Sequence, residues 1–220
     1  VIAQKNPAYV SEHLDRIQWY LNYGSDKNIN DLWYERLFEP NATNPNTYCA
    51  DFSNLNALLT KSGWDRVKQN CNKLKVIYTM RDPVSRVWSH FKFHMQFIGK
   101  GDQIIESSTD NFVEMLGKDW FWNHARYDQC LYRLERFLDQ EGLMVLYFED
   151  FRNSPQKTMD GLMNFLEIPK ISMPESSSKP VNASKEMQMP EEWRQIVLEK
   201  LTPTLEALRL DDRIHDKWIF

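Results

Sequence analysis

An arginine stands where a predicted buried strand passes into a predicted helix. Residues 73–80 (KLKVIYTM) are apolar and β-branched at their centre, which is typical of a strand. Pro83 ends this strand, because it lacks the N–H of a strand ladder, and it suits the first turn of a helix that reaches about Ile98. Arg81 is therefore expected at the carboxyl end of the strand, the edge at which open α/β sheets bind ligands.

Ser89 stands two helical turns further along and is expected to face back toward the same edge. A guanidinium and a hydroxyl at this spacing can hold a phosphate group through charge-assisted hydrogen bonds. A structural interpretation is open as well: Arg81 pairs with Asp82 or Glu149, and Ser89 has no specific role. The spacing alone favours neither interpretation.

Strands and helices alternate along the rest of the chain. A second apolar strand is predicted at 143–148, with helices at 109–117, 126–140, 155–166 and 190–209, the last bent or interrupted at Pro203. Nearer the N-terminus, Ser11 and Asp31 are predicted helix caps, residues 47–52 a short strand and 55–70 a broken helix. The alternation predicts a parallel sheet between two layers of helices, which is a three-layer α/β fold.

The composition excludes several classes of protein. The 27 Lys and Arg against 31 Asp and Glu give a net charge of −4, which argues against a general nucleic-acid binder. No apolar run approaches the roughly 20 residues that span a bilayer, and no signal peptide is visible, so a cytoplasmic location is expected. The three cysteines lack CxxC spacing and the pair His90 and His94 lacks a third ligand, so neither a disulfide framework nor a metal site is expected.

The pattern Arg81-x-Pro83-x-x-Arg86-x-x-Ser89 resembles the signature with which sulfotransferases bind the 3′-phosphate of 3′-phosphoadenosine 5′-phosphosulfate (PAPS). Residues 143–169 (LMVLYFEDFRNSPQKTMDGLMNFLEIP) are similar to the second landmark of that family, a strand ending in Tyr/Phe-Glu-Asp, a turn with proline and a helix. Both landmarks occur in the family's order. Weaker similarities cover residues 4–9, 48–53 and 181–184.

The resemblance implies a single sulfotransferase domain over residues 1–220, with a P-loop-like fold. It implies that Arg81 and Ser89 hold the 3′-phosphate and that Tyr127 lies near the nucleotide or the acceptor. Lys179 is either a solvated lysine or part of a lid over the 3′-phosphate. PAPS is the expected co-substrate, PAP the product, and no metal is implied. The acceptor is a hydroxyl of a glycan, small alcohol, phenol, lipid or carrier-bound group.

Two departures from the family pattern affect the expected mechanism. The phosphosulfate loop, Pro-Lys-x-Gly-Thr-Thr, is expected shortly before Lys5 and is not found, so we expect a domain lacking its first strand and this loop. Asn6 stands where many glycan-type members carry a catalytic Glu, and an amide cannot act as a base at neutral pH. Asp51 is then the leading candidate base, with helix capping as its alternative role.

Two other functions remain open at this point. A nucleotide kinase or another P-loop NTPase shares the architecture, but it would need a Walker loop and a magnesium carboxylate. A non-catalytic sulfotransferase-like binding module is favoured by the missing loop and by Asn6. Separate measurements of PAP binding and of sulfate transfer distinguish this module from an enzyme.

Overall fold

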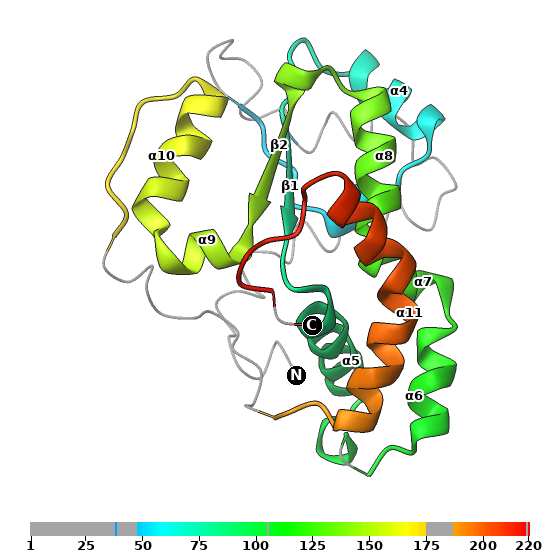
Figure 1. Cartoon of the computed structure of the whole chain (residues 1–220). Helices are drawn as coiled ribbons and strands as arrows, with labels where there is room; N and C mark the ends of the chain where they lie inside the picture. The colour runs from blue at the N-terminus through cyan, green and yellow to red at the C-terminus, as the bar shows by residue number, and fades with distance from the viewer. Residues whose placement is uncertain (1–37, 39–47, 105, 175–186, 219) are drawn as a thin grey trace. The chain divides into compact units, whose positions relative to one another are not determined.

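The computed structural model describes Phe38 and residues 48–104, 106–174, 187–218 and 220 (Figure 1). Its contacts divide the chain into two compact units, residues 1–53 with 66–72, and residues 54–65 with 73–220. The helices predicted to begin at Ser11 and Asp31 lie outside the described residues. The sheet, the helices around it and the strand-to-helix junction at Arg81 all belong to the second unit.

The sheet of the second unit is parallel, as the alternation of elements predicts. Strands β1 (Val76–Met80) and β2 (Leu143–Tyr147) pair so that Met80 lies opposite Tyr147. Their carboxyl ends therefore coincide, and Arg81 and Phe148 leave the sheet at the same edge. The strands are less buried than predicted, because the described sheet has two strands and each keeps one unpaired edge.

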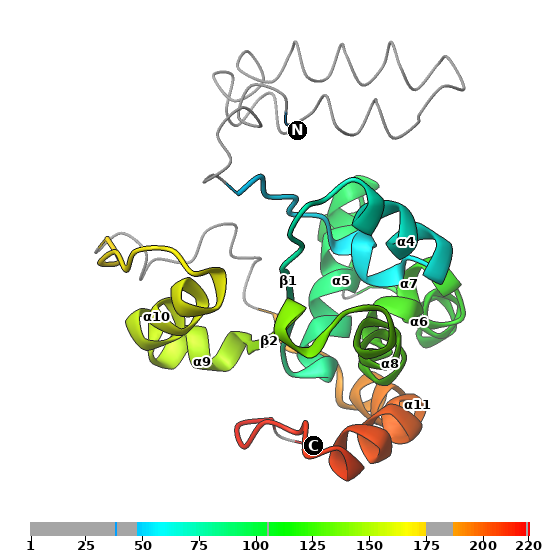
Figure 2. The same cartoon turned by 90° about the horizontal axis from the view of Figure 1, so that it is seen from above.

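Helices cover both sides of this strand pair, which confirms the α/β class (Figures 1 and 2). Helices α9 (Phe148–Asn153) and α10 (Pro155–Leu166) lie on one side. Helices α8 (Tyr127–Phe137) and α11 (Glu191–Leu210) lie on the other, together with α5 (Pro83–Phe97), which continues directly from β1. Helix α11 is continuous through Pro203.

The remaining elements test the local predictions. The broken helix consists of η1 (Asn54–Leu58) and α4 (Lys61–Gln69), and α6 spans Thr109–Leu116, both as predicted. The strand predicted at 47–52 is wrong, because residues 48–53 have no regular structure. The short elements α7 (Asp119–Trp122), η2 (Gly101–Gln103), η3 (Asn123–Ala125) and η4 (Gln140–Gly142) were not predicted. Within the described residues, no helix is long and apolar enough to cross a membrane.

The apolar stripe of α5 anchors the junction in the core. Its members are all buried, as the helical spacing predicts: Val84, Val87, Trp88, Phe91 and Met95. Phe91 meets the edge of Phe112 at a ring distance of 5.0 Å, and Phe112 stacks on Trp193 of α11 at 4.3 Å. Burial of these rings fixes one face of α5 in the core.

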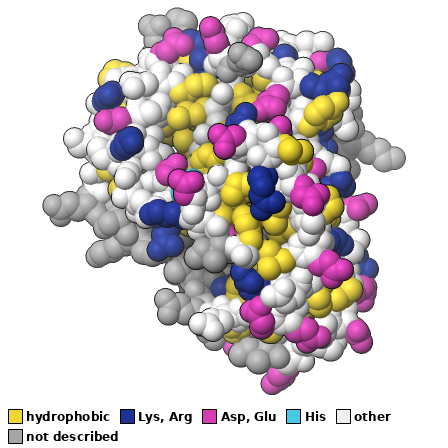
Figure 3. All heavy atoms as spheres, viewed as in Figure 1, with side chains coloured by type: hydrophobic (Ala, Val, Ile, Leu, Met, Phe, Trp, Pro, Cys, Tyr) yellow, Lys and Arg dark blue, Asp and Glu magenta, His cyan; other side chains and the backbone are white. Residues whose placement is uncertain are grey.

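A second apolar cluster supports the carboxyl end of β1. Met80 and Tyr127 are almost fully buried and pack with Leu131, Leu208 and Trp218. On the surface drawn in Figure 3, basic, acidic and hydrophobic side chains are intermixed, so the described side chains of that face form no field of one sign.

Candidate functional site

The turn between β1 and α5 is fixed by two carboxylates. Asp82 caps α5, and its Oδ1 accepts a hydrogen bond from the N–H of Ser85 at 2.6 Å. Pro83 then occupies the first helical turn, where its missing N–H costs nothing. Glu149, from the edge of the neighbouring strand, accepts a hydrogen bond from the N–H of Asp82 through Oε1 at 2.8 Å. These bonds tie the residues after the two strands together.

Arg81 does not form the ion pair that the structural interpretation requires. Among the described residues, no salt bridge joins it to Asp82 or Glu149. One oxygen of each carboxylate accepts from a main-chain N–H, and the other is buried without a hydrogen-bond partner among these residues. The guanidinium lies 5.3 Å from the ring centroid of Phe148. A half-buried cation at the sheet edge is therefore available to an anionic ligand.

Tyr127 holds the main chain of Arg81. Its hydroxyl accepts from the Arg81 N–H at 3.3 Å and donates to the Arg81 carbonyl at 3.1 Å. Burial raises the pKa of Tyr127 to about 12, so the hydroxyl keeps its proton for this bond. Arg86 donates through Nε to the carbonyl of His124 at 2.8 Å, and its guanidinium lies 5.8 Å from the Tyr127 ring. Tyr127 thus acts on the site through Arg81.

Ser89 lies on α5, about two helical turns after the strand-to-helix junction. It is half-buried, and its hydroxyl has no hydrogen bond to another described residue. Ser85, Ser89 and Lys92 follow one another at helical spacings of four and three residues and share one face.

Lys92 is a buried cation on the same face. Its side chain is 7% exposed, and its Nζ lies 5.6 Å from the ring centroid of Trp88. Burial lowers the pKa of Lys92, and the positive charge of Arg81 lowers it further.

The histidines of α5 pack against aromatic rings. His90 stacks on Phe121 at a ring distance of 4.3 Å and meets the edge of His124 at 5.7 Å, while His94 lies 5.0 Å from Trp120. Burial lowers the pKa of His90 to about 4, with His124, Arg86 and His94 adding to the effect. Among the described residues, no three His, Cys, Asp or Glu side chains gather as metal ligands. The histidine pair is used in packing.

Two of the predicted site residues lie outside the described part of the second unit. Asp51 is exposed within residues 48–53, so the strand that was expected to carry it does not form. It belongs to the first unit, whereas Arg81 belongs to the second. Lys179 lies outside the described residues. The roles of Asp51 and Lys179 stay predictions.

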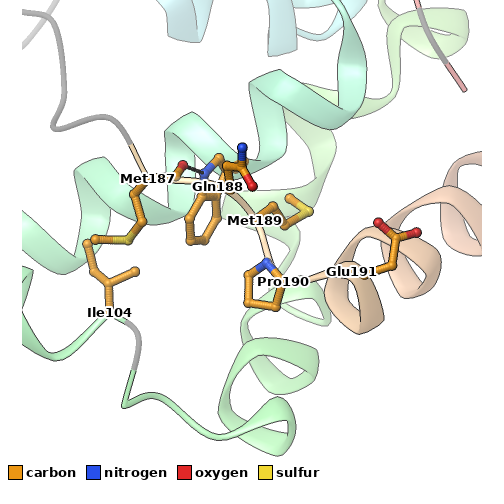
Figure 4. Close-up of a pocket in the computed structure, with 7 residues that line it drawn as sticks. Ile104, Met187, Gln188, Met189, Pro190 and Glu191 are labelled. Atoms are coloured by element: carbon orange, nitrogen blue, oxygen red, sulfur yellow. Dashed lines mark hydrogen bonds between the residues drawn. The ribbon is translucent and has the colours of Figure 1, made fainter.

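An apolar pocket of about 390 Å³ lies beside α5 (Figure 4). It is lined by Trp88, Ile104 and the segment Met187–Glu191. The indole N–H of Trp88 donates to the carbonyl of Met187 at 2.7 Å, which holds that segment against the helix. Arg81 and Ser89 do not line this pocket.

The second unit thus has a parallel sheet, an arginine at a strand end that forms no ion pair with the described residues, and a serine on the following helix. The family model described as "Sulfotransferase family" matches residues 24–172, more than half of the chain. The chain belongs to the sulfotransferase family. This membership confirms the family resemblance of the sequence and supports sulfuryl transfer as the general activity.

A solved structure agrees with this assignment at the level of the fold. The crystal structure of a sulfotransferase from Alicyclobacillus acidocaldarius is similar with a TM-score of 0.61 and 18% sequence identity. The similarity covers 86% of this chain and 74% of that one. The search of curated proteins gave no match.

Proposed function

We propose that this sulfotransferase uses PAPS as its donor and binds the donor's 3′-phosphate with Arg81 and Ser89. The observation that supports this proposal is the guanidinium of Arg81, which no carboxylate of the described residues pairs with. The two nearest carboxylates, Asp82 and Glu149, accept from main-chain groups instead. The Arg81 guanidinium is therefore the group of this junction that can meet an anionic ligand.

The chemistry of a 3′-phosphate suits these two side chains. Its dianion accepts paired hydrogen bonds from a planar guanidinium, and a serine hydroxyl can donate a further one. Tyr127 bonds to both the N–H and the carbonyl of Arg81, so the backbone of this arginine is held in place. Fixed binding groups lose little entropy when the ligand arrives, which favours affinity.

In the proposed reaction an acceptor hydroxyl attacks the sulfur of PAPS. An O–S bond forms to the acceptor, the bond from sulfur to the phosphate oxygen breaks, and PAP leaves. The hydroxyl proton passes to a general base. Asp51 remains our candidate for that base, and Lys179 our candidate for a residue that covers the 3′-phosphate. The acceptor is a hydroxyl of a glycan, a small alcohol or a carrier-bound group.

A nucleotide titration tests this function. PAP, 5′-AMP and Mg-ATP are titrated separately into the protein by calorimetry, and transfer from sulfur-labelled PAPS is assayed on a panel of hydroxyl acceptors. We expect PAP to bind about ten- to a hundredfold more tightly than 5′-AMP, because only PAP carries the 3′-phosphate. Tighter binding of Mg-ATP than of PAP would favour the kinase-like alternative. PAP binding without transfer to any acceptor would favour a non-catalytic module.

A further inference from the structure

The segment after α11, residues 211–218, is held at the carboxyl end of β2. The hydroxyl of Tyr147, the last residue of β2, donates to the carbonyl of Arg213 at 3.2 Å. The ring of His215 lies 5.0 Å from that of Tyr147, and its Nε2 is 3.1 Å from Oδ1 of Asp150 in α9. Side chains at the end of β2 and in α9 therefore fix the path of this segment.

Trp218 brings this segment into the second apolar cluster. Its side chain is 6% exposed and lies in one cluster with Tyr127 and with Met80, the last residue of β1. The ring centroids of Trp218 and Tyr127 are 6.3 Å apart, and those of Trp218 and Tyr147 are 5.8 Å apart. The indole N–H has no hydrogen-bond partner among the described residues. Trp218 therefore contributes to this cluster through the packing of its ring.

Tyr127 connects this packing to the proposed phosphate site. Its ring lies against Trp218, and its hydroxyl is bonded to the N–H and the carbonyl of Arg81. Tyr78 and Arg86 also contact the ring, at 6.1 and 5.8 Å, but they belong to β1 and α5 and not to the segment after α11. Removal of the Trp218 ring leaves space into which the Tyr127 ring can shift, and the two hydrogen bonds to Arg81 weaken as they lengthen.

We infer that Trp218 is a positioning residue of the donor site, which holds Tyr127 and, through it, the backbone of Arg81 in the arrangement that binds the 3′-phosphate. This inference rests on the proposed function, because it needs PAP to bind at Arg81. Binding groups that are already held in place lose less entropy when the ligand arrives, so a loosened Arg81 binds PAP more weakly. 5′-AMP lacks the 3′-phosphate, so its affinity should not depend on Trp218. Because coupling between two sites is reciprocal, bound PAP should in turn stabilise the packing of residues 211–218.

Two substitutions of Trp218 test the inference, because Trp218→Leu removes the aromatic ring and Trp218→Phe keeps one. PAP and 5′-AMP are titrated by calorimetry into the wild type, both variants and the control Trp64→Leu, which removes a buried tryptophan of α4 outside this cluster. We expect Trp218→Leu to bind PAP about three- to tenfold more weakly than the wild type and to keep 5′-AMP affinity within about twofold. Trp218→Phe should stay within about twofold for PAP, since the indole N–H that it lacks has no described partner. Trp64→Leu should bind both nucleotides as the wild type does.

Hydrogen exchange of the wild-type protein tests the same link without a substitution. Exchange of the amides of residues 211–218 is followed by mass spectrometry without nucleotide, with saturating PAP and with saturating 5′-AMP. The segment has bonded amides to follow, because the N–H of Trp218 donates to the carbonyl of His215 at 2.9 Å and that of Arg213 to the carbonyl of Leu208 at 2.7 Å. We expect PAP to slow this exchange more than 5′-AMP does.

The outcomes separate this inference from the proposed function. If the wild type prefers PAP to 5′-AMP and a folded Trp218→Leu protein keeps that preference, Trp218 is not a positioning residue and the proposed function stands. Equal losses for both nucleotides, or the same loss in Trp64→Leu, would indicate a general structural effect and overturn the inference. If Trp218→Leu does not fold, the exchange measurement decides, and exchange that saturating PAP leaves unchanged counts against the inference. A wild type that does not distinguish the nucleotides would overturn both proposals.

Discussion

At the residue scale, Tyr127 is bonded to the main chain of Arg81. Its position before a helix suggested a place near the nucleotide, and that placement stays a prediction. The structure adds a function that no sequence pattern shows, since the hydroxyl both accepts from and donates to Arg81. Such a contact joins residues 46 positions apart and depends on the packing of α8 against β1.

Tyr127→Phe is expected to lower the free energy of unfolding by about 1–3 kcal/mol, because it leaves the N–H and the carbonyl of Arg81 without a partner. PAP affinity should fall as well, since the backbone of Arg81 is no longer held by the Tyr127 hydroxyl. Urea unfolding and calorimetry measure the two effects. Tyr132→Phe, at an exposed tyrosine of α8, is the control and should stay within about 0.5 kcal/mol of the wild type. Equal stability of Tyr127→Phe and wild type would contradict the bridging role.

At the element scale, the strand-to-helix junction was predicted well because its signals are local. The apolar run before Arg81, the proline after it and the helical stripe of α5 each specify their structure within a few residues. The strand predicted at 47–52 was wrong, since its mixed sequence has no comparable signal. The one-turn helix α7 was missed because its four residues form through aromatic packing between distant segments.

The cap of α5 gives a stability prediction for this junction. Asp82→Ala removes the acceptor of the Ser85 N–H and should cost about 0.5–2 kcal/mol of unfolding free energy. Asp82→Ser is the matched variant, because serine also caps helices and should recover most of that loss. Denaturant midpoints of the three proteins provide the comparison. If Asp82→Ala were as stable as the wild type, the cap would contribute nothing to the junction.

His90 gives the junction a dependence on pH. Its pKa is about 4 in the folded protein, below the usual value of about 6.5, because burial disfavours the charged ring. The unfolded chain therefore binds the extra proton first, so stability should fall as pH decreases from about 6.5 to about 4. The neighbouring His94, His124 and Arg86 act in the same direction. The contribution of His90 is at most about 3 kcal/mol.

His90→Phe keeps a ring against Phe121 and removes the titrating group. Urea unfolding at pH 7 and at pH 4.5 should show a smaller loss of stability in this variant than in the wild type. His215→Phe is the control, because His215 lies on another part of the chain beside Tyr147. An identical loss in His90→Phe and wild type would show that His90 does not contribute to the acid sensitivity.

At the scale of the whole molecule, the fold and the family were predictable, whereas the full set of site residues was not. The two landmarks around Arg81 and residues 143–169 each combine a strand, a turn and a helix, so they indicate the fold as well as the family. The neighbours of Arg81, such as Tyr127 and Glu149, come from distant segments, and no linear pattern shows these contacts. The sequence suggested that the candidate base Asp51 ends a strand at the same sheet edge as Arg81. That strand does not form, and Asp51 belongs to the other compact unit.

Asp51→Asn tests the candidate base in the transfer reaction. We expect its rate at saturating PAPS to fall about 10²–10⁴-fold with PAP affinity unchanged, because an amide keeps the shape of the carboxylate and loses its basicity. Asp110→Asn, at an exposed aspartate of α6, should keep the wild-type rate. A rate within about threefold of the wild type, or about 0.65 kcal/mol of barrier height, would remove Asp51 from the mechanism.

The most direct test of the central claim, that the unpaired cation at the end of β1 binds the donor's 3′-phosphate, is a PAP titration of Arg81→Met. Arg152→Met, at an exposed arginine of α9, serves as its control. We expect Arg81→Met to bind PAP about ten- to a hundredfold more weakly than the wild type, while Arg152→Met binds it normally. Wild-type PAP affinity in a folded Arg81→Met protein would contradict the account.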